Sequence, residues 1–163
     1  MKESLKAKET ILVLGVGNVA LCDEGFGVYV ARRMRGVSLP ENVRVQEGAV
    51  AGLDLLGSIT DIDRLIVVDA MIADLKPGEI GYFELDERIN AANKTNLSFH
   101  QLGIAEILQI GALMGHKPQV EFVVAKPEKL ELGFELSENM QIAVDKAVHY
   151  LTEMLVGNVP VKG

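Results

Sequence analysis

A short apolar run that ends in two closely spaced glycines constrains the fold of this 163-residue chain more than any other feature. Ile11–Leu14 is rich in branched side chains, and such a run closed by glycine is typical of a strand buried on both faces. Gly15 and Gly17 allow the backbone to turn sharply and to approach another group closely. The sequence therefore predicts a strand at Thr10–Gly15 and a glycine turn, followed by a helix at Glu24–Arg35, where apolar residues recur at helical spacing.

Two adjacent acids, Asp23 and Glu24, follow this glycine turn. In open α/β sheets, ligands bind just beyond the carboxyl ends of the strands. The two acids are therefore expected in the part of the fold where chemistry takes place.

A dinucleotide site is an alternative interpretation of the same segment. Gly15–Ala20 fits the loose pattern G-x-G-x-x-[G/A], and Glu47, near the end of the next predicted strand, could bind a ribose. That fingerprint needs the helix to begin within the glycine turn, so that its free N–H groups meet the pyrophosphate. Here residues 21–25 intervene, and Asp23 and Glu24 would repel a phosphate. The pattern therefore favours another use of the turn.

Strand and helix patterns alternate along the rest of the chain. Strands are expected at Val43–Gln46, Arg64–Ala70, Ile80–Phe83 (an antiparallel edge) and Pro118–Val124, and helices at Leu53–Ile59, 98–113 and 137–154. This alternation predicts an α/β three-layer sandwich, in which a largely parallel twisted sheet of about five strands carries helices on both faces. We expect one domain over residues 1–163, with residues 1–9 flexible.

Composition narrows the class of protein. The net charge of −7 disfavours a nucleic-acid binder, because phosphate contacts need a basic face. Cys22 is the only cysteine, which excludes an internal disulfide and a cysteine-based zinc cluster. No apolar run approaches the roughly 20 residues of a membrane helix, and the charged segment Met1–Glu9 is unlike a signal peptide. We expect a cytoplasmic protein that does not associate with membranes.

An acid and a histidine elsewhere in the chain are further candidates for the site. Asp69 directly follows four apolar strand residues, where a carboxylate costs free energy unless it is hydrogen-bonded, paired or metal-bound; capping of a turn or helix is the other interpretation. His100 falls in the first turn of a helix that Ser98 caps. Helix charge there favours a neutral imidazole, which can bind a metal, although a capping or packing role is the more common one for a single histidine.

Glu24, Asp69 and His100 are all expected at one edge of the predicted sheet. Two carboxylates and an imidazole can form an open site for a divalent ion such as nickel, zinc or iron.

Three separated motifs of this chain are similar to those of the nickel–iron hydrogenase maturation endopeptidases. The chain resembles that family over nearly its whole length, through residues 11–18 with 23–27 (ILVLGVGN and DEGFG), 65–70 (LIVVDA) and 98–103 (SFHQLG), and through a closing loop that contains Lys126-Pro127-Glu128 and residues 133–137.

The resemblance implies a function and a site. These enzymes cut a short C-terminal tail from the precursor of the hydrogenase large subunit after nickel has been inserted. The family's metal-contacting residues fall on Glu24, Asp69 and His100, which would engage the nickel of the substrate. It implies no permanently held cofactor and a precursor as partner; a monomer is our expectation.

The chemistry of the cut stays open at this point. The chain has no Ser-His-Asp or His-Glu-x-x-His signature, so an activated water is the expected nucleophile, with Glu24, Asp69 and His100 as the candidate catalytic residues. The metal could activate this water, or one carboxylate could act as general base. A nucleophilic role for Cys22 has no evident histidine partner.

A non-catalytic, nickel-sensing assembly chaperone is the alternative function. Related proteins often carry a glycine and a threonine where this chain has Ala49 and Val50, which leaves that turn without an assigned side-chain role.

Overall fold

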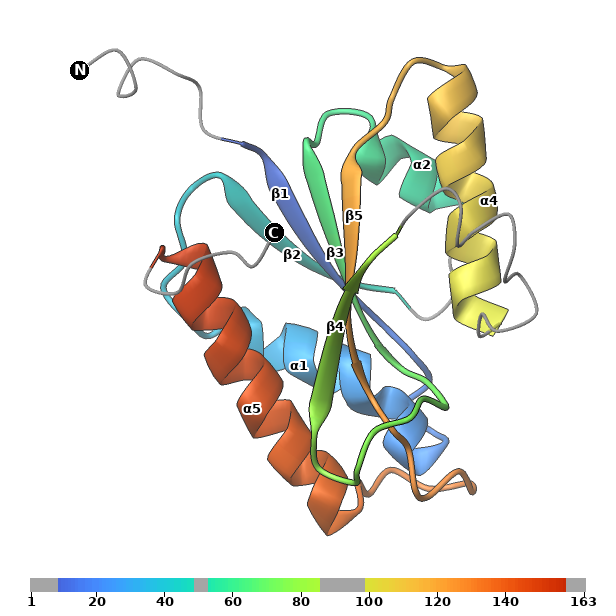
Figure 1. The fold of residues 1–163 in the computed structure, drawn as a ribbon, viewed down its shortest axis with the longest axis vertical. Coiled ribbons are helices and arrows are strands. Elements are labelled where there is room, and N and C mark those ends of the chain that lie inside the picture. Colours follow the sequence, from blue (N-terminus) through green and yellow to red (C-terminus); the bar gives the residue numbers. More distant parts are fainter. Residues whose placement is uncertain (1–8, 49–52, 86–98, 158–163) are drawn as a thin grey trace.

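A five-stranded sheet lies between two layers of helices in the computed structural model, which describes residues 9–48, 53–85 and 99–157 (Figure 1). The elements follow in the order β1 (Ile11–Val16), the 3-10 helix η2 (Cys22–Gly25), α1 (Phe26–Met34), β2 (Val43–Gly48), α2 (Leu53–Ile59), β3 (Arg64–Ala70), β4 (Ile80–Glu84), α4 (Phe99–Leu113), β5 (Gln119–Ala125) and α5 (Glu138–Leu155).

The sheet is parallel except at one edge. Its strand order is β2-β1-β3-β5-β4, and only β4 runs antiparallel to its neighbour β5. Every residue of β1 and β3 is buried, which is why each strand is built around a continuous apolar run, Ile11–Leu14 in β1 and Leu65–Val68 in β3, rather than an alternating pattern. The predicted sheet and its antiparallel edge strand are confirmed.

The two faces of the sheet bury separate apolar clusters. On β3, Ile66 and Val68 pack with α1 and α5, whereas Leu65 and Val67 pack with α2 and α4. Successive strand residues point to opposite faces, so one apolar run supplies both clusters. The predicted arrangement of helices on both faces is therefore also confirmed.

Glycines bring α1 onto the ends of β1 and β3. A Cβ on Gly15 would lie 2.0 Å from the Gly27 carbonyl oxygen, and a Cβ on Gly27 would lie 2.0 Å from the carbonyl oxygen of Val68. Only glycine fits at either position. The close approach predicted for the first glycine turn is thus an approach of helix to strand.

Glu47 has a partner other than a ribose. Its carboxylate is held by Arg32 at 3.2 Å and by Arg35 at 3.0 Å, both from the neighbouring helical segment. Hydrogen bonding and charge from these arginines hold the pKa of Glu47 below its usual value. The ribose-binding role that the dinucleotide interpretation gave to this acid is not supported.

Two predicted boundaries differ from the structure by more than one residue. The helix expected from Glu24 begins only at Phe26, because residues 22–25 form η2, whose first N–H groups donate to a distant loop rather than to the turn before it. Strand β2 continues to Gly48, because Glu47 and Gly48 stay in register with β1. Both shifts come from tertiary contacts that local patterning does not reveal.

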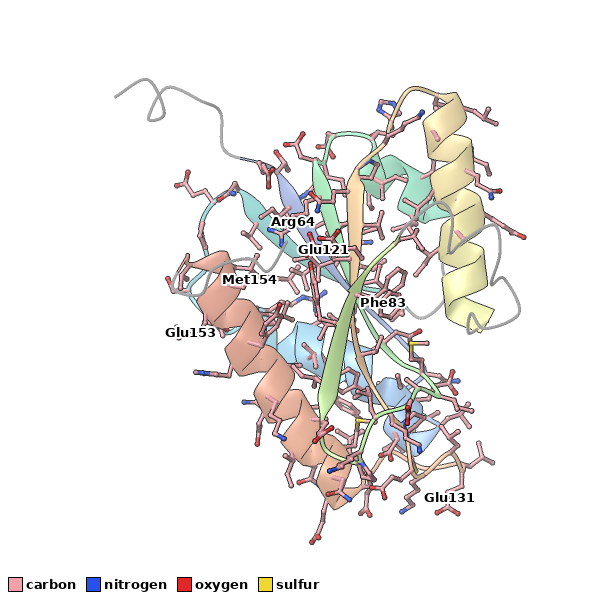
Figure 2. All side chains as sticks on the ribbon, viewed as in Figure 1. Arg64, Phe83, Glu121, Glu131, Glu153 and Met154 are labelled. Atoms are coloured by element: carbon pink, nitrogen blue, oxygen red, sulfur yellow. The ribbon has the colours of Figure 1, made fainter. Side chains whose placement is uncertain are left out.

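A buried ion pair lies at the end of the sheet where β3 begins, which is opposite to the carboxyl ends of the parallel strands (Figure 2). Arg64 binds Glu121 through two nitrogens, with 2.7 Å between Nη2 and Oε2, and the Tyr82 hydroxyl donates to the same carboxylate at 2.8 Å. Buried charges are tolerated when they are paired and hydrogen-bonded in this way.

Among the described helices, none has the length and apolar character to cross a membrane.

Candidate active site

The turn that carries Glu24 is built by backbone contacts at the carboxyl end of β1. Glu24 lies in η2, is partly exposed, and belongs to an element that contacts β3. Gly17, at φ +148, lies directly beneath it, since a Cβ there would be 2.1 Å from the Glu24 carbonyl oxygen. The second glycine of the motif thus sets the position of the Glu24 backbone.

Asp23, beside Glu24, is a buried acid whose carboxylate accepts four hydrogen bonds. Its side chain is fully buried and accepts hydrogen bonds from the Glu128 and Lys129 N–H groups (2.9 Å each) and from the N–H and hydroxyl of Ser137 (2.8 Å each). Burial alone would raise the pKa of Asp23, but these hydrogen bonds outweigh it and hold the pKa below its usual value. Asp23 is therefore a charged anchor for the segment that precedes α5.

Backbone hydrogen bonds fix that same segment, residues 126–136, against η2. Cys22 N–H donates to the Gly133 carbonyl, Gly133 N–H to the Ala20 carbonyl, and Asp23 N–H to the Lys129 carbonyl, each at 2.9 Å. We call residues 126–136 the clamped loop; Glu131, labelled in Figure 2, marks it at the end of the molecule where β5 finishes. The loop is therefore joined to the Glu24 turn by backbone hydrogen bonds.

Asp69 lies near the end of β3, inside the strand predicted at Arg64–Ala70. It is fully buried and stands opposite Val124 of β5. Leu65 and Val67 face α2 and α4, so the strand alternation directs Asp69 to that same face of the sheet. Since β3 contacts η2, Asp69 and Glu24 belong to packed neighbouring elements at the carboxyl end of the sheet.

His100 is the second residue of α4, as the predicted first-turn position requires. Helix α4 packs on α2 and ends near the start of β5, so it begins toward the carboxyl ends of the parallel strands (Figure 1). The side chain of His100 lies outside the described part of the chain, as do Ser98 and residues 49–52.

The ligand set Glu24, Asp69 and His100 therefore stays a prediction. The described side chains include no group of three or more His, Cys, Asp or Glu residues that could hold a metal ion, and the His100 imidazole is not among them. What the fold supplies is one partly exposed carboxylate, one buried carboxylate and a helix start at the same end of the sheet.

Cys22 has a packing role in this arrangement. Its thiol is buried, and its Sγ lies 3.0 Å from where a Cβ on Gly133 would be. A reactive cysteine needs access and an electropositive environment, and a buried thiol lacks the first. The structure therefore gives no support to a nucleophilic Cys22.

Asp23 is the residue of this region whose role sequence reasoning missed. The four groups that donate to it lie more than 100 positions away, at residues 128–137. The only hint of this role in the sequence was Ser137, which was expected to open the last helix. Ser137 does cap that helix, by accepting a hydrogen bond from the Met140 N–H at 3.2 Å.

Comparisons with known proteins agree with the arrangement of elements described above. Residues 28–154 match a family profile described as hydrogenase maturation protease. The chain is 33% identical over 148 residues to the hydrogenase 2 maturation protease of Escherichia coli, covering 89% of this chain and 90% of that protein. It is 37% identical over 123 residues to the hydrogenase expression/formation protein HupD of Rhizobium leguminosarum, covering 74% of this chain but only 61% of HupD.

A solved structure is similar over the same extent. The hydrogenase maturating endopeptidase HybD from E. coli superposes with a TM-score of 0.79 at 33% sequence identity, over 90% of this chain and 91% of that one. Sequence and fold thus point to the same group of peptide hydrolases, and this chain belongs to the hydrogenase maturation protease family.

Proposed function

We propose that this protein removes the C-terminal tail from the large-subunit precursor of a nickel–iron hydrogenase after nickel has been inserted. Family membership supports the processing of a hydrogenase precursor. The observation that carries the finer proposal is the packing of the Glu24 turn against β3, which holds Asp69, beside a helix that begins with His100 in its first turn.

In this proposal nickel belongs to the substrate and marks it as ready. Glu24, Asp69 and His100 engage the nickel of the precursor, because carboxylates and a neutral imidazole suit a divalent ion of this kind. The peptidase holds no metal of its own, so the purified protein should contain no stoichiometric metal by elemental analysis. We further propose that it acts in the cytoplasm as a monomer on one precursor at a time, which light scattering of the protein alone and with precursor would check.

In this proposal the cut uses water and groups of the chain, and the nickel of the substrate serves recognition. Water attacks the carbonyl carbon of the scissile bond and loses a proton to a carboxylate that acts as general base. The carbon–nitrogen bond then breaks, and the leaving amine takes up the proton that the carboxylate accepted, which restores the carboxylate. Glu24 is the better candidate for the base, because it is partly exposed whereas Asp69 is fully buried.

The test is the intact mass of a cognate precursor, with and without nickel, after incubation with this protein. The proposal predicts loss of one C-terminal peptide from the nickel-loaded precursor only. Cleavage of both forms would keep the peptidase and reject nickel recognition. A loaded, competent precursor that stays intact would reject cleavage and leave a nickel-sensing chaperone, which binding of the precursor would reveal.

Asp69→Asn is the matching variant. It preserves the shape of a buried side chain but removes its charge, so we expect the preference for nickel-loaded over nickel-free precursor to fall by about tenfold or more, as loss of a metal ligand does. Circular dichroism should report an unchanged fold. Asp74→Asn, which alters an exposed acid in the following loop, is the control and should cleave normally. Normal discrimination by Asp69→Asn would remove this residue from the proposed ligand set.

A further inference from the structure

The clamped loop exposes large apolar side chains at three alternating positions. Leu130, Leu132 and Phe134 are 53%, 85% and 70% exposed, although the residues between them are charged or glycine. A single exposed apolar side chain is ordinary on a protein surface. Three in one short loop are a feature that interaction sites have and that a solvated loop does not need.

This loop is held in place rather than loosely attached. Asp23 accepts hydrogen bonds from Glu128 of the loop and from Ser137 directly after it. Gly133 is hydrogen-bonded to the segment before η2, and the Tyr29 hydroxyl donates to the Phe134 carbonyl at 3.1 Å. The conformational entropy that ordering the loop costs is therefore already lost when the protein folds. A partner that binds it would not lose affinity to that cost.

The position of the loop points to the occupant. Gly133 of this loop forms a parallel bridge with Leu21, only three positions before Glu24. A chain segment that contacts Leu132 and Phe134 would therefore run beside the Glu24 turn. A second copy of this protein bound at this loop would cover the candidate site. A precursor segment bound there would instead lead its own chain into that site, so a precursor segment is the occupant that fits.

We propose that the clamped loop binds an extended, apolar segment of the precursor next to the bond that is cut, with Leu132 and Phe134 as the main contacts. Asp23 acts as a positioning residue, because it holds this surface at a fixed place relative to Glu24. The inference rests on the proposed function for the identity of the partner.

Leu132→Ser combined with Phe134→Ser tests the proposal, with Leu113→Ser as the matched control. Leu113 is 90% exposed but lies at the far end of α4, at the other end of the sheet. All three side chains are mostly exposed, so each variant should unfold at the temperature of the wild type. Single-turnover cleavage of nickel-loaded precursor, over a range of peptidase concentrations, separates the half-saturating concentration from the maximal rate. Pull-down titration of the precursor reports binding directly.

The double variant should raise the half-saturating concentration about tenfold and leave the maximal rate unchanged, since central apolar contacts dominate binding. Leu132→Met with Phe134→Leu should restore binding. If the wild type cleaves and the double variant matches it within about twofold in both assays, the surface is rejected and the peptidase stands. If the wild type binds without cleaving and the double variant binds about tenfold more weakly, the peptidase is rejected and the surface stands. If the wild type neither binds nor cleaves, both are rejected.

Discussion

At single positions, the region around Glu24 is arranged by residues that do no chemistry themselves. Gly17 leaves room for the Glu24 carbonyl, and Asp23 ties the turn to the clamped loop. Neither Gly17 nor Asp23 belongs to the predicted ligand set. A site of this kind is sensitive to substitutions that never touch a substrate.

Gly17→Ala is expected to disturb the site more than its size suggests. The new Cβ would lie 2.1 Å from the Glu24 carbonyl oxygen, at a φ of +148 that L residues rarely adopt. Strain of this kind costs about 1–3 kcal/mol, and relief of the clash has to displace Glu24. We therefore expect a lower free energy of unfolding in urea and loss of most cleavage activity.

Gly57→Ala is the control for that experiment. Gly57 lies in helix α2, and a Cβ there would meet nothing within 4 Å. Alanine is favoured over glycine in a helix by about 1 kcal/mol, so this variant should be at least as stable as the wild type. Equal stability and activity for the two variants would show that Gly17 does not position Glu24.

Among the elements, α5 has an N-terminus with two tasks. Ser137 accepts a hydrogen bond from the Met140 N–H, as a helix cap does, and its hydroxyl also donates to Asp23 at 2.8 Å. A serine can do both because a hydroxyl is donor and acceptor at once. The start of α5 is thereby coupled to the Glu24 turn.

Ser137→Ala and Ser137→Asp separate these tasks. Alanine loses the cap and one hydrogen bond to a buried charge, which should lower the free energy of unfolding by about 2–3 kcal/mol. Aspartate caps helices as well as serine does, but it cannot donate to Asp23 and adds a like charge beside it. Chemical denaturation should therefore find the Asp variant no more stable than the Ala variant. If Ser137→Asp had the same free energy of unfolding as the wild type, capping of α5 alone would account for the contribution of Ser137 to stability.

The elements themselves were accessible from the sequence because their signals are local. Apolar runs and helical spacing placed the five strands and the helices within a few residues, and the same run explained burial on both faces of β3. The 3-10 turn at residues 22–25 and the role of Asp23 were not accessible, because both depend on donors and acceptors near residues 128–137. Convergence of Glu24, Asp69 and His100 is still a prediction, although the first two lie on elements that touch.

Over the whole molecule, the two ends of the sheet have different chemistry. Near the starts of β3 and β5, Arg64 and Glu121 form a buried ion pair, and the partly buried Tyr82 donates a hydrogen bond to Glu121. At the carboxyl end, Glu24 is partly exposed. One end therefore serves stability, and the other carries the candidate chemistry.

Tyr82→Phe tests the stabilising end through its dependence on pH. Burial first, and then the hydrogen bond to Glu121, raise the pKa of Tyr82 well above its usual value. In the unfolded chain tyrosine ionises near pH 10, whereas the folded protein keeps the proton, so the stability due to Tyr82 is present below about pH 10 and is lost as pH rises further. Phenylalanine has no proton to lose.

The expected result is a stability difference between wild type and Tyr82→Phe that shrinks with rising pH. Near pH 8 the wild type should be more stable by about 1 kcal/mol, from the hydrogen bond. Near pH 11 thermal unfolding should find that advantage reduced. A difference that stays constant over this range would mean that Tyr82 does not hold its proton in the folded state.

The hydrogen bonds that anchor Asp23 also have a consequence for the time at which the site exists. Their donors lie 105 to 114 residues beyond Asp23 in the chain, so no local folding of the N-terminal half can complete the Glu24 turn. Contacts of such long sequence separation form late and slowly. During synthesis on the ribosome, the turn must wait until residue 137 has emerged, by which time all five strands have been made. A nascent or truncated chain that ends before the clamped loop would carry Glu24 without the frame that positions it.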